Sequence, residues 1–193
     1  MGKPSTGNLI KKETALLLAL VAMVIGFVGG VVFGAFKASS TPPVTHNQTG
    51  MTMQNDALEK ARAETLKHPE SFSAWVDLGN LYFDLQQSRD AIKAYNQALS
   101  INPDNANVLT DLGVMYRHAG EPEQAIAAFD KAIAVDPKHE QSRFNKGIVL
   151  LHDLNKKEEA IKVWKELLAV NPMAMAANGL SVDEIVRKVE ATP

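Results

Sequence analysis

Cysteine is absent from this chain of 193 residues. The protein therefore has no disulfide framework and offers no cysteine for lipid attachment. A glycine-rich phosphate loop and the HExxH and G-x-S-x-G patterns are absent as well. We therefore expect a protein that is not an enzyme, with no catalytic residue, no metal ion and no cofactor. The histidines are scattered without metal-ligand spacing, at His46, His68, His118, His139 and His152.

An excess of basic residues is also lacking. From Asp56 to the end of the chain there are 21 acidic and 16 basic residues, a net charge of −5, with no basic stripe. Nucleic acid is a polyanion, and the proteins that bind it carry a clustered positive surface. We therefore expect no nucleic-acid partner.

Residues 15–36 contain no charge at all, and most of them are apolar. A helix over these 22 residues would be about 33 Å long, enough to cross a hydrocarbon core of about 30 Å. A cleaved signal peptide is the main alternative, but its apolar region is normally about 7–15 residues long and ends in a small-x-small site. The run here is longer, and Phe36 and Lys37 interrupt the approach to Ala38. We therefore predict an uncleaved transmembrane signal anchor at 15–36.

Lysines are unevenly distributed around this span. Lys3, Lys11 and Lys12 precede it, whereas Lys37 alone follows it directly. Positive residues favour the cytoplasmic side, so we predict that residues 1–14 are cytoplasmic. The carboxy-terminal part would then lie in the periplasm, anchored to a bacterial inner membrane. A eukaryotic organelle receptor with cytosolic repeats would share this layout.

Small residues recur at every fourth position of the span. In a helix Ala22, Gly26, Gly30 and Gly34 lie along one side, and such a ladder lets a second helix approach closely. We predict that the span pairs there, as a homodimer or with another helix. Glycine is common in membrane helices generally, so simple tolerance of glycine is the alternative.

Residues 37–55 are predicted to be a flexible linker. From Ala38 to Asn55 the segment has no formal charge and is rich in Ser, Thr, Pro, Asn, Gln and Gly. Binding of a soft metal ion is an alternative role for residues here and near the C-terminus. The residues for it would be His46, Met51, Met53, Met173 and Met175.

The remaining sequence repeats with a period of 34 residues. Gly79, Gly113 and Gly147 are spaced at this interval. In the second half of each unit an alanine is followed four residues later by an aromatic residue, and a proline closes the unit. These residues are Ala91 and Tyr95, Ala125 and Phe129, Ala160 and Trp164, with Pro69, Pro103, Pro137 and Pro172.

This pattern resembles the tetratricopeptide repeat family, whose units read W-x2-L-G-x2-Y, then A-x3-F, then P. Trp75, Leu78, Gly79 and Tyr82 match the first part in full, and the second unit has Leu109 in place of the tryptophan. The third unit departs most, with one residue inserted in its turn at 153–155. It has Arg143, Lys146 and Leu150 at the Trp, Leu and Tyr positions. The units are predicted at 72–105, 106–139 and 140–174.

The resemblance implies an all-α fold, a right-handed superhelix of about eight helices. Residues 56–71 keep the spacing of a second helix without its first, which predicts an N-terminal half repeat. Ser181 and Glu184 form a capping box that opens a helix within residues 175–193. This helix is expected to cover the last unit.

In this family the first helix of each unit lines a concave groove that meets the ligand. The resemblance therefore implies a groove that suits an extended or helical peptide. Asn80, Asn107 and Gln141 would bond the peptide backbone, and Phe144 and Ile148 would cover its side chains. Packing against neighbouring helices is the alternative role for any one of these residues. The implied groove residues are Ser73, Val76, Asn80, Phe83, Asp84, Asn107, Thr110, Val114, Arg117, His118, Gln141, Phe144, Ile148, Leu151 and His152.

One variant of this groove is not expected. Family members that grip a terminal carboxylate have Lys, Asn, Asn, Lys and Arg at fixed positions. Loss of the cations and addition of an aspartate both oppose binding of an anion. The corresponding residues here are Val76, Asn80, Asp111, Gln141 and Asn145, of which Asn80 alone matches.

The expected function is that of a membrane-anchored adaptor that binds a protein or peptide in the groove. The layout resembles the membrane-bound repeat proteins of bacterial cytochrome c maturation. A role there, or in the assembly of another periplasmic complex, is therefore a narrower hypothesis. One alternative is an oligomeric membrane scaffold, assembled through the span and the repeat edges without a dedicated ligand. Another is a metal or haem carrier that uses the methionines named above.

Overall fold

The structure is a computed structural model that describes residues 46–192. The predicted span at 15–36, its ladder of small residues and the flanking lysines lie outside the described residues. Among the helices that the structure describes, none is both long enough and apolar enough to cross a membrane. The chain divides into two parts after Met51, and the helical repeats belong to the second part.

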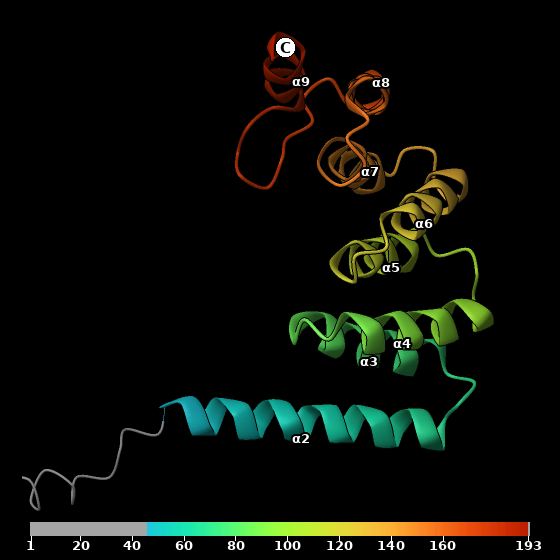
Figure 1. The fold of residues 1–193 in the computed structure, drawn as a ribbon. Helices are drawn as coiled ribbons and strands as arrows, with labels where there is room; N and C mark the ends of the chain where they lie inside the picture. The colour runs from blue at the N-terminus through green and yellow to red at the C-terminus, as the bar shows by residue number, and fades with distance from the viewer. Residues whose placement is uncertain (1–45, 193) are drawn as a thin grey trace, which may run out of the picture. The chain divides into compact units, whose positions relative to one another are not determined.

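Eight helices follow one another through residues 46–192, and from the second of them onward each contacts the next (Figure 1). The described chain otherwise contains turns and one isolated β-bridge between Met175 and Ser181. This confirms the expected all-α repeat fold. The helices are α2 (His46–Lys67), α3 (Phe72–Asp84), α4 (Ser88–Ile101), α5 (Ala106–His118), α6 (Pro122–Val135), α7 (Glu140–His152), α8 (Lys157–Val170) and α9 (Val182–Ala191).

Helix α2 begins inside the segment that was predicted to be a flexible linker, and the prediction was wrong from His46 onward. No proline occurs between Pro43 and Pro69. The Gln, Met and Asn residues that follow each cost less than about 1 kcal/mol in a helix. Once the helix formers from Ala57 onward have formed the first turns, extension toward the N-terminus needs no new nucleation. Polar composition alone therefore misplaced the start of the helix.

Each unit joins its two helices through a glycine on the first and an aromatic ring on the second. All three rings are completely buried. In the first two pairs, a Cβ atom on the glycine would lie 2.5 Å from the nearest ring carbon. Such a distance is far inside van der Waals contact, so these glycines permit an approach that any other residue would block. The pairs are Gly79 with Tyr95, Gly113 with Phe129, and Gly147 with Trp164.

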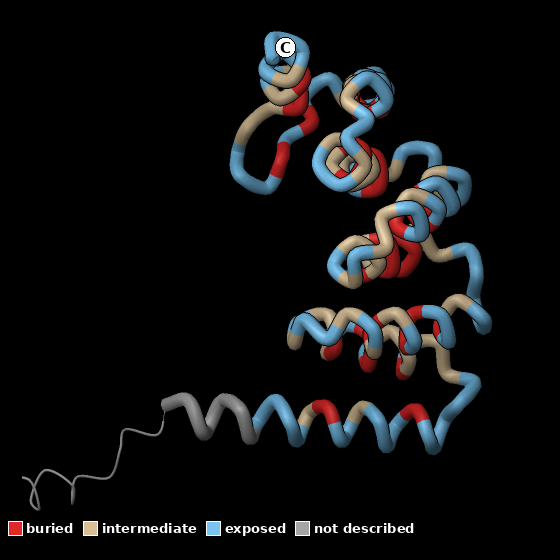
Figure 2. The backbone as a smooth tube through the Cα atoms, in the orientation of Figure 1, coloured by how far each residue is buried: buried red, intermediate tan, exposed pale blue. Residues whose placement is uncertain are grey.

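Helix α2 covers the first unit at its N-terminal side. Leu58 is buried in one cluster with Leu78 and Tyr82, whereas most other residues of α2 from position 53 onward are exposed (Figure 2). At the position where later units carry a buried ring, α2 has the small Ala61. A terminal element with a polar outer surface is what a stacked repeat needs to remain soluble.

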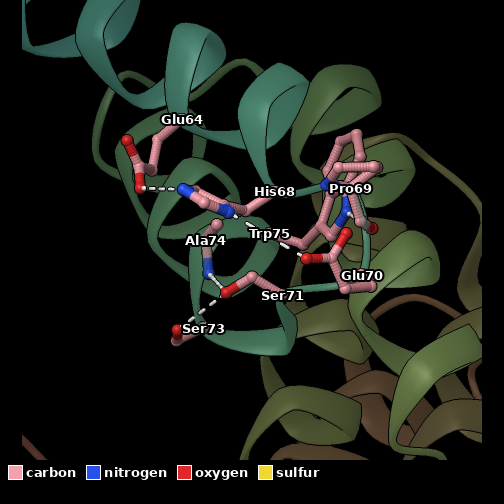
Figure 3. A network of polar contacts seen from close by, with 8 residues as sticks. All are labelled: Glu64, His68, Pro69, Glu70, Ser71, Ser73, Ala74 and Trp75. Carbon is pink, nitrogen blue, oxygen red and sulfur yellow. Dashed lines mark hydrogen bonds and ion pairs between the residues drawn. The ribbon is translucent and has the colours of Figure 1, made fainter.

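Polar contacts fix the turn between α2 and α3 (Figure 3). Ser71 caps α3 by accepting a hydrogen bond from the backbone N–H of Ala74, at 3.3 Å. The indole N–H of Trp75 donates to the carbonyl oxygen of Pro69 at 2.8 Å. His68 is exposed, and its ring nitrogens lie 3.6 and 3.9 Å from glutamate carboxylates on either side. The turn thus holds the Trp75 ring against the end of α2.

Helix α9 packs against the last unit. The Ser181 hydroxyl accepts a hydrogen bond from the backbone N–H of Glu184 at 3.1 Å, as the capping box predicts. Val182 and Val186 are buried in the same cluster as Trp164 of α8. The apolar side of α9 therefore continues the core of the third unit.

Candidate peptide-binding groove

Helices α3, α5 and α7 are the first helices of the three units, and they carry the predicted groove residues. Positions three, four and seven apart lie on one face of an α-helix. The structure places seven of the predicted groove residues around two separate hollows. We call the one between α3 and α5 the acidic hollow, and the one between α7 and α9 the apolar hollow.

The acidic hollow has a volume of about 200 Å³. Asn80, Phe83 and Asp84 line it from α3, Tyr95 from α4 and Asp111 from α5. The Tyr95 hydroxyl donates a hydrogen bond to Oδ1 of Asn80 at 2.9 Å. That bond orients the amide, because Oδ1 must face the phenol, and it leaves the amide N–H groups free to donate to a ligand.

Two carboxyl groups set the charge of the acidic hollow. Burial raises the pKa of Asp111 to about 6. Burial, and the charges of Asp111 and Asp84, raise the pKa of Tyr95, so its phenol keeps its proton at neutral pH. The ion pairs between described residues use other carboxylates. The hollow therefore suits the cationic end of a lysine or arginine side chain, whose charge would pair with both aspartates.

The apolar hollow has a volume of about 440 Å³. The Phe144 ring lies over Trp164, with 6.3 Å between ring centroids and an angle of 31° between the ring planes. The Trp164 indole N–H donates to the Phe144 carbonyl oxygen at 3.1 Å, which fixes the ring that forms the floor. This hollow suits an apolar side chain. Its lining comprises Phe144, Ile148, Leu151 and His152 of α7, Trp164 of α8, residues 176–178, and Ile185 and Val189 of α9.

Thr110 does not line the groove, and this prediction was wrong. Its side chain is buried between α5 and α7. Its hydroxyl bonds the Ala106 carbonyl oxygen at 2.7 Å and the hydroxyl of Ser142 at 2.6 Å. Ser142 is completely buried and small, so α7 approaches closely enough to cover Thr110. The family pattern does not specify a residue at position 142, and it therefore does not predict the contact between Thr110 and Ser142.

Asn107 and Arg117 remain on the surface of α5, but each already has a partner. The Nδ1 atom of His139 caps α7 by accepting from the backbone N–H of Ser142 at 3.3 Å. The ring proton of neutral His139 is then on Nε2, which donates to Oδ1 of Asn107 at 2.9 Å. Nε of Arg117 donates to the Asp153 carboxylate at 2.5 Å. The amide N–H groups of Asn107 are still free for a ligand.

The other predicted groove residues lie outside both hollows. Val76 and Val114 are half-buried and pack against the cluster of the first two units. Gln141 is exposed on the first turn of α7. The described residues contain no cluster of three or more His, Asp or Glu side chains that could hold a metal ion.

Sequence reasoning missed three parts of the two hollows. The repeat pattern identifies Tyr95 only as a packing residue, although its hydroxyl, absent from the equivalent Phe129, indicates a polar environment. The family pattern identifies Asp111 only as a residue that opposes a carboxylate clamp. The contribution of α9, through Ile185 and Val189, had no signal, because the repeat pattern ends before that helix.

Comparisons with known proteins agree with the repeat. A tetratricopeptide repeat family model matches residues 55–106, 76–140 and 119–163, which together cover more than half of the chain. Three similar solved structures are a crystal structure of MamA protein, the first such domain of Spaghetti (RPAP3) bound to the HSP90 peptide SRMEEVD, and the Sgt2 domain from Aspergillus fumigatus. No curated protein matches the chain.

The likeness to these structures is one of fold. The MamA structure is 26% identical, with 64% of this chain and 67% of that chain covered and a TM-score of 0.59. The RPAP3 domain is 22% identical, with 62% and 90% covered and a TM-score of 0.54. The Sgt2 domain is 21% identical, with 62% and 76% covered and a TM-score of 0.55. With its matched repeats and its three glycine–ring pairs, the chain belongs to the tetratricopeptide repeat family.

Proposed function

We propose that this protein is an adaptor that binds a segment of a partner protein across α3, α5 and α7. The observation that carries the proposal is the pair of hollows of different chemistry on this one row of helices. A lysine or arginine of the bound segment enters the acidic hollow, and an apolar side chain enters the apolar hollow. Amide groups on the row, including those of Asn80 and Asn107, bond the backbone of the segment.

The solved relatives support peptide binding, and comparison with them indicates which charge the bound segment should carry. The RPAP3 domain is bound to the peptide SRMEEVD, which is rich in acidic residues. In our chain Asp84 and Asp111 line the acidic hollow, so a segment with an acidic end is disfavoured there. We therefore expect the partner segment to be basic at one end.

The adaptor is further proposed to be a single-pass protein of a bacterial inner membrane, with the repeats in the periplasm. The uncharged run at 15–36 and the lysines before it support this placement. Cytochrome c maturation is the narrower proposal and rests on the similar layout alone. An alkaline phosphatase reporter fused to the C-terminus tests the compartment, because it is active in the periplasm and inactive in the cytoplasm. Activity equal to that of a fusion lacking residues 1–37 would contradict the placement.

Selection from a displayed library of random 12-residue peptides tests the binding function. With the purified full-length chain as bait, we expect enriched peptides to combine Lys or Arg with apolar residues. Phe144→Glu places a charge in the apolar hollow and should weaken the selected peptides at least about tenfold. Leu66→Glu, a change at an exposed position on α2, serves as the matched control and should leave the affinity unchanged. No enrichment, or equal loss in both variants, would contradict the function.

The ladder of small residues keeps one alternative open, a scaffold that assembles through the span. Sedimentation of the full chain and of a chain without residues 1–37 distinguishes the adaptor from the scaffold. Self-association that needs Gly26, Gly30 and Gly34, in a chain that selects no peptide, would favour the scaffold.

A further inference from the structure

A third hollow lies on the other side of α5 from the groove. Its volume is about 580 Å³, larger than either groove hollow and within the range of about 300–1,000 Å³ that is typical of ligand sites. Leu109, Leu112 and Tyr116 line it from α5. At 100° per residue these three positions face away from Asn107 and Val114, which belong to the groove side. The hollow is therefore separate from the proposed peptide site.

The same place in the first unit is filled by a tryptophan. Leu109 lies one period of 34 residues after Trp75, and Pro103 of this hollow lies one period after Pro69. In the first unit the Trp75 indole N–H donates to the Pro69 carbonyl oxygen at 2.8 Å (Figure 3). The first unit thus shows what this position of the fold accommodates.

The frame around the position is shared by the two units. In the first unit the Tyr82 hydroxyl accepts a hydrogen bond from Nε of Arg62, at 2.9 Å. One period later the Tyr116 hydroxyl accepts from the amide of Asn96, at 3.4 Å. The second unit therefore keeps the tyrosine and its polar partner but has the smaller leucine where the indole would lie. The third unit has Arg143 at this position, and its side chain is itself buried.

The walls of the hollow suit an aromatic ring. Its floor is apolar, from Leu109, Leu112 and Leu99. Three of the six residues on its α6 wall are alanines, whose short side chains leave room. Polar residues stand around it, as at the rim of many protein interfaces. The alanines are Ala127, Ala128 and Ala134, and the polar residues are Asn96, Asp104, Gln124 and Lys131.

We propose that this hollow, here called the indole hollow, receives a tryptophan side chain from a partner protein. The indole lies on Leu109 and Leu112, and its N–H donates to the Pro103 carbonyl oxygen, as Trp75 donates to that of Pro69. A second copy of this chain does not supply the ring. The chain has two tryptophans; Trp164 is completely buried and Trp75 is bonded within its own unit.

The test uses N-acetyl-5-fluorotryptophanamide as the probe and 19F NMR of the probe with the purified full-length chain. We expect line broadening with the wild type and loss of broadening with Leu109→Trp, which fills the hollow from within. Leu109→Met keeps the side-chain volume and should retain the broadening. Equal broadening in all three proteins, or none with the wild type, would overturn the proposal.

A second pair of variants tests the proposal even if Leu109→Trp does not fold. Ala127→Leu obstructs the hollow from an exposed position on α6 and should abolish the broadening. Ala63→Leu makes the same change at an exposed position on α2, away from the hollow, and should leave it unchanged. Broadening of free 5-fluorotryptophan without broadening of the amide probe would show a site for the amino acid and would also overturn the protein partner.

Discussion

The acidic and apolar hollows occupy equivalent positions of the first and third units, yet they are built in different ways. The acidic hollow lies between two first helices, and its distinctive groups are Tyr95 and Asp111 within the repeat pattern. The apolar hollow lies between a first helix and α9, a helix outside the repeats. One fold thus obtains two binding chemistries, one by changing residues inside a unit and one by adding an element at the end. Variants that affect one hollow and spare the other test this difference.

The largest effect is expected from Trp164→Ala. The indole is completely buried, packs on Gly147 and supports Phe144. Its loss should lower the free energy of unfolding by about 3–5 kcal/mol. Urea unfolding measures the loss, and binding of a peptide with an apolar end should weaken with it. Trp75→Ala removes a partly exposed indole and should cost less. An equal cost would contradict the argument that complete burial of the Trp164 ring sets the size of the loss.

The next largest effect is expected from Thr110→Val, which removes a hydrogen bond between α5 and α7. The change removes one partner of the buried Ser142 hydroxyl, at 2.6 Å, and leaves the other, Nδ1 of His139 at 2.7 Å. The expected loss in the free energy of unfolding is therefore that of one hydrogen bond, about 0.5–1.5 kcal/mol. Peptide affinity should stay unchanged, because Thr110 is buried and lies outside both hollows. Calorimetry and peptide titration of the same variant measure the two quantities. If the variant is fully folded and still binds the peptide more weakly, Thr110 contacts the peptide and belongs to the groove.

Asp111→Asn tests the acidic hollow through the pH dependence of the free energy of unfolding. Burial raises the pKa of Asp111 from 3.8 to about 6, so the folded chain binds this proton more tightly than the unfolded chain. The contribution of Asp111 to the free energy of unfolding should therefore fall as pH rises from about 4 to about 6. Urea unfolding at several pH values should show this fall in the wild type but not in the variant. Asp77→Asn, at an exposed carboxyl on α3, is the control and should keep it.

The smallest effect is expected from Arg117→Ala. The ion pair of Arg117 with Asp153 is part-exposed, and such pairs contribute about 0.2–1 kcal/mol. Thermal unfolding at low salt should show a small decrease in Tm that disappears in high salt. Lys93→Ala, which breaks an exposed pair within α4, gives the reference. A larger loss for Arg117 would mean that this pair fixes α5 relative to α7.

The sequence was sufficient to predict the helical pairs, because their contacts depend on residues that recur in phase. Gly79 and Tyr95 meet for the same steric reason as Gly113 and Phe129, so periodicity alone predicts them. The family pattern also predicts that α3, α5 and α7 carry the candidate groove residues, and each of these helices lines one of the two hollows. These predictions concern backbone geometry, which the recurring residues control.

What the sequence did not predict depends on residues that do not recur. Thr110 is covered because one neighbour, Ser142, happens to be small. The start of α2 depends on propagation from a helix further along the chain, which local composition does not record. The apolar hollow needs Val189 of α9, whose distance from α7 no repeat fixes. Contacts that involve residues or helices outside the repeat pattern therefore cannot be predicted from the periodicity.

The glycine–ring pairs also bear on how the chain acquires its fold. Gly79 and Tyr95, like Gly113 and Phe129, are 16 residues apart, and Gly147 and Trp164 are 17 apart. Contacts of such short range require little loop closure, and chains dominated by them fold quickly. Each unit can therefore close soon after its second helix emerges during synthesis, before the next unit exists. A chain that is made from the N-terminus then always has α2 in place to cover the first unit that forms.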